Sequence, residues 1–273
     1  MNIILLKSLF YFMASFLCSF IIIEILIKYS SKLNLIDHPD YRKIHSEATP
    51  VVGGLGIIIT FVILILFSWY NKWELFSLRI EESIILAIAS FIIILTGLID
   101  DLRGLKARDK FLFQIIAAVM VVVGISNLQQ IDWPLSELFD STIYNSIMCV
   151  FYIISILNAI NLIDGLDGLA GGVSIIITTT FVGLSILSGG YLTDLFPMYI
   201  LLGSLVGFMY YNKPPARTFL GDTGSLFIGW FFALSSLLYA QKTNLSLSIL
   251  LPIMVLGLPA FDVIFVMLRR FSS

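Results

Sequence analysis

Long apolar runs alternate with short polar breaks along almost the whole chain. A bilayer core about 30 Å thick is crossed by about 20 apolar residues in a helix, and runs of this kind recur from one end of the sequence to the other. They predict about nine transmembrane helices, near residues 9–27, 51–70, 83–99, 111–125, 143–158, 170–188, 195–211, 223–240 and 246–268. The expected fold class is all-α, a polytopic transmembrane helical bundle that forms one integral-membrane domain over residues 1–273.

If the helices cross the membrane alternately in opposite directions, the loops fall into two sets, one on each side. Basic residues are divided unevenly between these two sets. Of the 16 lysines and arginines, all but four fall on the side that carries Arg42 and Lys43. The exceptions are Lys7, Lys72, Arg79 and Lys242. Because cytoplasmic loops are enriched in Lys and Arg, we expect the N-terminus outside and the C-terminus inside the cell.

The composition agrees with a membrane protein and narrows the choice of partners. Hydrophobic residues make up 59% and charged residues 12% of the 273 positions, whereas soluble domains carry about 25% charged residues. The mean hydropathy is +1.00. A net charge of −2, without a lysine-rich tail, argues against nucleic acid as a partner. Cys18 and Cys149 lie inside apolar runs and are interpreted as buried hydrophobic residues.

Four polar segments interrupt the apolar pattern, and the alternation places all four on the cytoplasmic side. They are residues 37–54, residues 100–110, residues 158–168 and residues 221–225. Ionisable residues within membrane segments are costly and mark functional sites. The segments therefore predict one active site at the cytoplasmic edge of the membrane.

Asp100 and Asp101 close the third predicted helix. Adjacent carboxylates repel each other unless a cation or a shared proton relieves the cost, and the dipole of a helix opposes negative charge at its C-terminus. Magnesium takes one or two carboxylates and leaves its other positions to water and phosphates, so it fits this pair better than a merely solvated helix end does. Lys106 and Lys110 follow and could bind phosphate, although lipid anchoring explains most basic clusters of this kind.

Asn158, Asn161, Asp164 and Asp167 recur at intervals of three residues. In a helical turn this spacing places them along one side, where they can converge on one ligand. The glycines between them permit close approach of a ligand or another helix. Helix packing alone does not explain carboxylates in a stretch that contains no Lys or Arg.

Gly221 and Asp222 begin the apolar run near 223–240. The N–H groups and the positive dipole end of a helix that starts here could hold a phosphate, with Asp222 holding a metal ion. An aspartate that simply caps the helix explains the motif almost as well. Two further groups of small residues, Gly53-Gly54-Leu55-Gly56 and Gly203-x-x-x-Gly207, predict close helix packing.

The order and spacing of these motifs resemble those of the polyprenyl-phosphate N-acetylhexosamine-1-phosphate transferases, glycosyl transferase family 4. The matching motifs are Arg-Lys-x-His and Pro-x-x-Gly-Gly within residues 42–54, the paired aspartates at 100–101, Asn-x-x-Asn-x-x-Asp-Gly-x-Asp-Gly at 158–168, Gly-Asp-Thr-Gly-Ser at 221–225 and Pro-x-x-Asp at 259–262. The Arg-Lys-Ile-His form is closer to the N-acetylglucosamine-1-phosphate transferases that initiate surface glycans such as lipopolysaccharide O-antigen.

The resemblance implies an enzyme of the bacterial inner membrane that transfers N-acetylhexosamine 1-phosphate from a UDP-sugar to undecaprenyl phosphate and releases UMP. It implies Mg²⁺, or Mn²⁺ in its place, with Asp222 and Asp101 as ligands. The catalytic residues that it implies are Asp100, Asp101, Asp164 and Asp167. The substrate-binding residues that it implies are Arg42, Lys43, Lys106, Lys110, Asn158, Asn161 and Gly221. A homodimer is one assembly that the sequence allows.

The sequence departs from the family pattern after Arg269-Arg270. Family members continue there into a loop with an Arg and a His-x-His-His motif and then into further helices, whereas this sequence stops at Ser273, so we expect a truncated form. Three alternatives stay open: a peptidoglycan-precursor phospho-N-acetylmuramoyl-pentapeptide transferase, a non-catalytic truncated homologue, and a transporter of lipid-linked glycans. Transporter sites lie near the bilayer midplane, whereas these carboxylates are predicted at the cytoplasmic edge.

Overall fold

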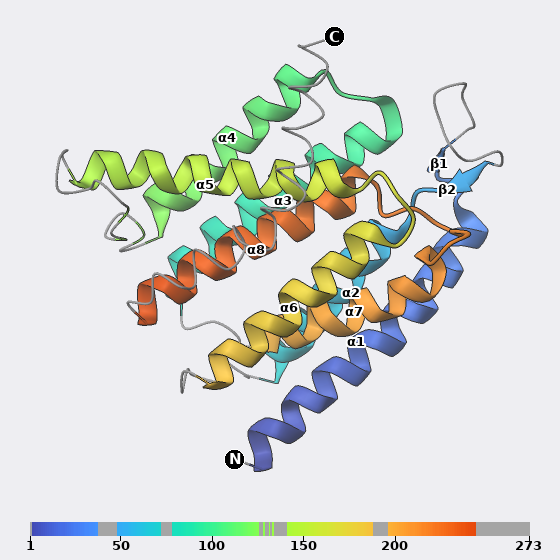
Figure 1. Ribbon diagram of the computed structural model, residues 1–273, viewed down its shortest axis with the longest axis horizontal. Helices are drawn as coiled ribbons and strands as arrows, with labels where there is room; N and C mark the ends of the chain where they lie inside the picture. The colour runs from blue at the N-terminus through green and yellow to red at the C-terminus, as the bar shows by residue number, and fades with distance from the viewer. Residues whose placement is uncertain are drawn as a thin grey trace, which may run out of the picture. The chain divides into compact units, whose positions relative to one another are not determined.

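The computed structural model describes residues 2–37, 48–71, 78–125, 128, 131, 133, 141–187 and 196–243. Within this part of the chain lie eight helices and one short pair of strands (Figure 1). The chain divides into two compact units. Unit 1 comprises Met1–Ser77 and Asp164–Gly224, and unit 2 comprises Leu78–Ile163 and Ser225–Ser273.

Unit 1 is built around helix α7. Its helices are α1 (Asn2–Tyr29), α2 (Gly53–Tyr70), α6 (Leu169–Leu187) and α7 (Phe196–Asn212). Helix α7 packs against the other three, and α1 also packs against α2 (Figure 1). A Cβ atom at Gly203 would collide with the Phe12 backbone of α1, and one at Gly207 would lie 2.9 Å from the Phe16 carbonyl oxygen. The prediction that this glycine pair serves helix packing is therefore confirmed.

The start of α2 is fixed by hydrogen bonds to the segment that follows α7. Strands β1 (Ile36–Asp37) and β2 (Thr49–Pro50) pair antiparallel just before α2. The Thr218 hydroxyl donates to the carbonyl oxygen of Pro50 at 2.9 Å, and the Gly54 N–H donates to the carbonyl oxygen of Leu220 at 2.9 Å. These bonds tie the chain that leads into α2 to the chain that leads into α8.

Unit 2 contains α3 (Ile80–Arg103), α4 (Ala107–Gly124), α5 (Ser141–Ile163) and the part of α8 (Gly221–Thr243) that begins at Ser225. Helix α4 packs against both α3 and α5. Helix α8 contacts α3 through Trp230, whose Nε1 donates to the Ser90 hydroxyl at 2.8 Å. It contacts α5 through the buried hydroxyls of Tyr152 and Ser236, which lie 2.8 Å apart. Polar pairs of this kind are a common means of joining helices within membranes.

The described helices overlap the eight apolar runs that were predicted before residue 244. Five of the helices that the structure describes are long and apolar enough to cross a membrane: Leu5–Tyr29, Gly53–Tyr70, Ile80–Arg103, Thr142–Ile163 and Gly221–Ala240. These helices confirm the expectation of a helical membrane protein for the described residues. The total of nine spans, the single domain and the orientation stay predictions, and the run near 246–268 lies outside the described residues.

Candidate active site

The connection between α3 and α4 places Asp100 opposite Lys110. Gly104 ends α3 with a φ of 70°, a conformation that residues with a Cβ rarely adopt. The chain then turns, and the Leu105 N–H donates to Asp100 Oδ1 at 2.7 Å. Lys110, in the first turn of α4, brings its Nζ to 2.8 Å from Asp100 Oδ2. Both oxygens of the Asp100 carboxylate therefore accept a hydrogen bond or an ion pair.

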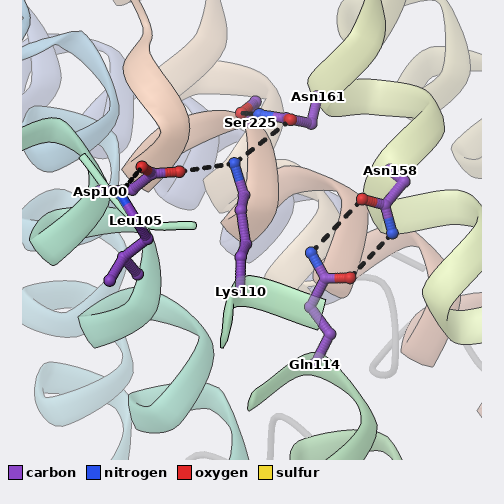
Figure 2. A network of polar contacts seen from close by, with 7 residues as sticks. All are labelled: Asp100, Leu105, Lys110, Gln114, Asn158, Asn161 and Ser225. Atoms are coloured by element: carbon purple, nitrogen blue, oxygen red, sulfur yellow. Dashed lines mark hydrogen bonds and ion pairs between the residues drawn. The ribbon is translucent and has the colours of Figure 1, made fainter. Parts of the chain in front are cut away.

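This ion pair is largely removed from solvent. The Asp100 side chain is 12% exposed and the Lys110 side chain 14% exposed. Burying either charge alone would be costly, and the pairing offsets that cost. Lys110 Nζ also donates to Asn161 Oδ1 at 3.4 Å, and Asn161 Nδ2 donates to the Ser225 hydroxyl at 2.8 Å. Figure 2 shows the resulting chain of contacts, which joins α3, α4, α5 and α8 within unit 2.

A second polar contact joins α4 to α5 one helical turn away. Asn158 Nδ2 donates to Gln114 Oε1 at 2.8 Å, and Gln114 Nε2 donates to Asn158 Oδ1 at 3.5 Å (Figure 2). Asn158 Nδ2 also donates to the carbonyl oxygen of Ile154 at 2.8 Å. Gln114 is buried, with 1% of its surface exposed. The two amides thus satisfy each other in an apolar helix interface.

A pocket of about 480 Å³ lies beside these contacts. Its lining residues are Ala107, Arg108, Lys110, Phe111, Gln114, Asn158 and Asn161. Ligand pockets typically combine apolar walls with a few placed polar groups, and this one offers an ammonium group and three side-chain amides. An ammonium group and amide donors can neutralise and orient a phosphate. The pocket therefore suits an anionic group that approaches along an apolar surface.

The structure brings together four of the predicted site residues: Asp100, Lys110, Asn158 and Asn161. Asp101 is half-buried in the last turn of α3. Lys106 immediately precedes α4 and is exposed.

Gln114 and Ser225 were not among the predicted site residues. Gln114 is a single amide within the apolar run 111–125, and it follows Lys110 by four residues. That spacing places the two side chains on one face of a helix, and it is the feature of the sequence from which Gln114 could have been predicted as a site residue.

The predicted helical row does not extend to Asp164 and Asp167, so that part of the prediction is wrong. Helix α5 ends at Ile163, and residues 164–168 form turns. Gly168, with a φ of 76°, has a backbone conformation outside the right-handed helix. Asp167 is exposed, and its Oδ2 accepts the Ala216 N–H at 3.0 Å. Within unit 1, the Asp167 carboxylate therefore binds the segment between α7 and α8.

Gly221 and Asp222 begin α8, as predicted. Asp222 is half-buried in the first turn, where the helix dipole favours a negative charge. Among the described residues, no three Asp, Glu, His or Cys side chains form a metal-binding cluster. Magnesium typically uses only one or two protein carboxylates, and a carboxylate such as that of Asp101, or that of Asp222, is the kind of ligand it takes. Arg42 and Lys43 lie outside the described residues.

Comparison with known proteins identifies the family. A family model described as glycosyl transferase family 4 matches residues 83–240. A Bacillus subtilis (strain 168) protein named "Probable undecaprenyl-phosphate N-acetylglucosaminyl 1-phosphate transferase" is 37% identical over 261 residues, which are 95% of this chain and 70% of that protein.

Two further relatives extend the comparison. A Thermotoga maritima undecaprenyl-phosphate alpha-N-acetylglucosaminyl 1-phosphate transferase is 29% identical over 92% of this chain and 72% of its own length. A Prochlorococcus marinus (strain MIT 9301) phospho-N-acetylmuramoyl-pentapeptide-transferase is 32% identical over 76% of this chain and 60% of its own length. These matches show that the chain belongs to glycosyl transferase family 4.

Proposed function

We propose that this chain transfers N-acetylglucosamine 1-phosphate from UDP-N-acetylglucosamine to undecaprenyl phosphate and releases UMP. Relatives from Bacillus subtilis and Thermotoga maritima are named for this transfer. The observation that carries the proposal is the Lys110 ammonium group, which Asp100 and Asn161 hold at the edge of a polar pocket. A buried, oriented cation is what a reaction between two anionic phosphates requires.

The reaction is a phosphoryl transfer. An oxygen of the lipid phosphate forms a bond to the β-phosphorus of the UDP-sugar, the bond from that phosphorus to the bridging oxygen breaks, and UMP leaves with that oxygen. Such reactions depend mainly on charge neutralisation and in-line positioning. Lys110 neutralises phosphate oxygens, and the Asn161 amide orients the substrate. Because both Asp100 oxygens are already engaged by the Leu105 N–H and Lys110, Asp100 holds the ammonium group in place.

The proposed reaction uses magnesium. Asp101 and Asp222 are the residues that would supply carboxylate oxygens to the ion, which would withdraw charge from the pyrophosphate. Asp164 and Asp167 orient the nucleotide-sugar. The residues that add positive charge or backbone donors toward the phosphates are Arg42, Lys43, Lys106 and Gly221.

The proposed location is the cytoplasmic face of the bacterial inner membrane. The polyprenyl tail stays in the bilayer there, while its phosphate meets a soluble nucleotide-sugar at the surface. A second candidate is transfer of phospho-N-acetylmuramoyl-pentapeptide, because the Prochlorococcus marinus relative carries that name. The Arg-Lys-Ile-His motif at 42–45 favours the N-acetylglucosamine reaction.

An assay with both donors tests the proposal. The purified chain in detergent is given undecaprenyl phosphate and either UDP-N-acetylglucosamine or UDP-N-acetylmuramoyl-pentapeptide, with and without magnesium. We expect UMP only from the first donor and only when lipid and magnesium are both present. Lys110→Met should lose this activity, whereas Ser155→Ala, at an exposed position of α5, should keep it. UMP from the second donor alone would replace the first proposal with the second, and UMP from neither would contradict both.

A further inference from the structure

The pairing of α4 with α5 has a regular geometry that the proposed reaction does not by itself explain. We propose that the amide pair Gln114–Asn158 fixes the register of these two helices and so places Lys110 and Asn161 for catalysis. Gln114 is then a positioning residue, which acts through Lys110 and Asn161. The kinetic part of this inference rests on the proposed transferase function, whereas the structural part does not.

The contacts between α4 and α5 form two steps of an antiparallel ladder. Lys110 contacts Asn161, and Gln114, four residues later on α4, contacts Asn158, three residues earlier on α5 (Figure 2). Intervals of four and three residues both approximate one helical turn of about 3.6 residues. The two contacts therefore lie one turn apart on both helices. A slip of α4 along α5 by one turn would break both contacts together.

The contact between Gln114 and Asn158 is the more restrictive of the two. The bond from Asn158 Nδ2 to Gln114 Oε1, at 2.8 Å, sets the alignment of the amide pair, and the reverse contact, at 3.5 Å, is longer. The bond from Asn158 Nδ2 to the Ile154 carbonyl oxygen fixes the Asn158 side chain against its own helix. Gln114, at 1% exposed, has almost no access to water as an alternative partner. Rotation or sliding of either amide would therefore leave buried polar groups unsatisfied, which is costly.

Stability alone is a poor explanation for this pair. Hydrogen bonds between helices in membranes contribute little free energy on average, and two apolar side chains of similar shape could replace both amides at little cost. Buried polar residues between helices have a better attested effect, because they select one register among several. The register matters here because the Lys110–Asn161 contact, at 3.4 Å, already lies near the upper limit of a hydrogen bond.

Kinetic measurements on a set of four variants test this inference. Misplacing a catalytic group by about 1 Å can cost about 100-fold in rate, so we expect Gln114→Leu to lower kcat by about ten- to a hundredfold. The exchanged pair, Gln114→Asn with Asn158→Gln, keeps both amides and should regain most of that loss. The apolar pair, Gln114→Leu with Asn158→Leu, should melt at a temperature close to that of the unsubstituted protein and yet stay impaired. Tyr152→Phe is the matched control, because it removes a buried contact between α5 and α8 elsewhere in unit 2 and should keep its kcat.

A distance measurement tests the register without reference to activity. Spin labels are attached at Arg108→Cys, in the first turn of α4, and at Leu162→Cys, near the end of α5, with the native cysteines replaced by alanine. Both positions are exposed. Pulsed electron resonance should give one narrow distance distribution, which Gln114→Leu broadens or shifts and the exchanged pair restores. Tyr152→Phe should leave it unchanged.

The two measurements separate the possible failures. An unchanged distance distribution in Gln114→Leu overturns the inference whatever the kinetics, and so does equal broadening in Tyr152→Phe. A kcat unchanged in Gln114→Leu also overturns it, provided that the unsubstituted protein is active. If the unsubstituted protein transfers no sugar phosphate but Gln114→Leu shifts the distance, the proposed function fails and the register assignment stands.

Discussion

Removal of the Lys110 ammonium group should destabilise the protein as well as inactivate it. Lys110→Met leaves the Asp100 carboxylate, 12% exposed, without the cation that lies 2.8 Å away. Loss of one partner of a buried ion pair costs about 3–5 kcal/mol. Because the Leu105 N–H still donates to Asp100, we expect the lower value, about 3 kcal/mol. At about 2–4 °C per kcal/mol for chains of this size, Tm should fall by about 6–12 °C.

A second variant shows whether an unpaired charge causes the loss. Asp100→Asn together with Lys110→Met removes both charges, and the introduced amide oxygen can still accept the Leu105 N–H. Most of the lost Tm should therefore return, because replacing both partners of a buried pair is far less costly than removing one. Arg108→Met is the stability control: the Arg108 side chain is 88% exposed and its partner is the adjacent Asp109, so its Tm should change little.

Thermal unfolding in detergent, followed by tryptophan fluorescence, gives the Tm values, and UMP release gives the activity. Both Lys110 variants should lose about 100- to 1000-fold in kcat, the usual effect of removing one group that stabilises transition-state charge. If the double variant melts as low as Lys110→Met, the loss of stability does not come from an unpaired carboxylate. If Lys110→Met keeps a tenth or more of the activity, the Lys110 ammonium group does not stabilise the transition state.

Three further predictions concern unit 1 and the metal. Gly203→Leu should sharply lower the yield of folded protein and its Tm, because a side chain there collides with α1, whereas Gly172→Ala, with no atom within 4 Å of the added Cβ, should not. Asp167→Ala should raise the KM for the nucleotide-sugar with a small change in Tm, because the exposed Ala216 segment loses its acceptor; an unchanged KM would argue against the assigned role. EDTA should abolish UMP release and magnesium restore it, and Asp222→Asn should remove that response; a variant with an intact magnesium response would exclude this ligand.

The helices were the most predictable part of the structure. Their positions follow from the length of apolar chain that a bilayer demands, so the runs near 51–70 and 223–240 correspond closely to α2 and α8. Close helix packing at Gly203 and Gly207 was also predictable, because close helix approach needs small residues at one-turn spacing, but α1 as the partner was not. Strands β1 and β2 were not predicted, since two residues each are too short for a periodic signal.

The candidate site was predictable in its residue types but not in its pairing. Spacing indicated that Asn158 and Asn161 share a helix face, and they do. The same spacing failed at Asp164 and Asp167, because α5 ends at Ile163 before it can carry them. No pattern in the sequence specifies which residue of α4 lies opposite which residue of α5, so the contact of Gln114 with Asn158 emerged only from the folded helices.

In the proposed reaction the sugar moves together with its phosphate, so the fate of the β-phosphorus distinguishes this reaction from transfer of the sugar alone. Purified protein in detergent is incubated with magnesium, undecaprenyl phosphate and UDP-N-acetylglucosamine that carries ³²P at the β-phosphate. Transfer of sugar 1-phosphate predicts that the ³²P enters the butanol-extractable lipid in a one-to-one ratio with the UMP released. Recovery of all the ³²P in water-soluble UDP, with the sugar on the lipid, would mean transfer of the sugar alone and would rule out the proposed reaction.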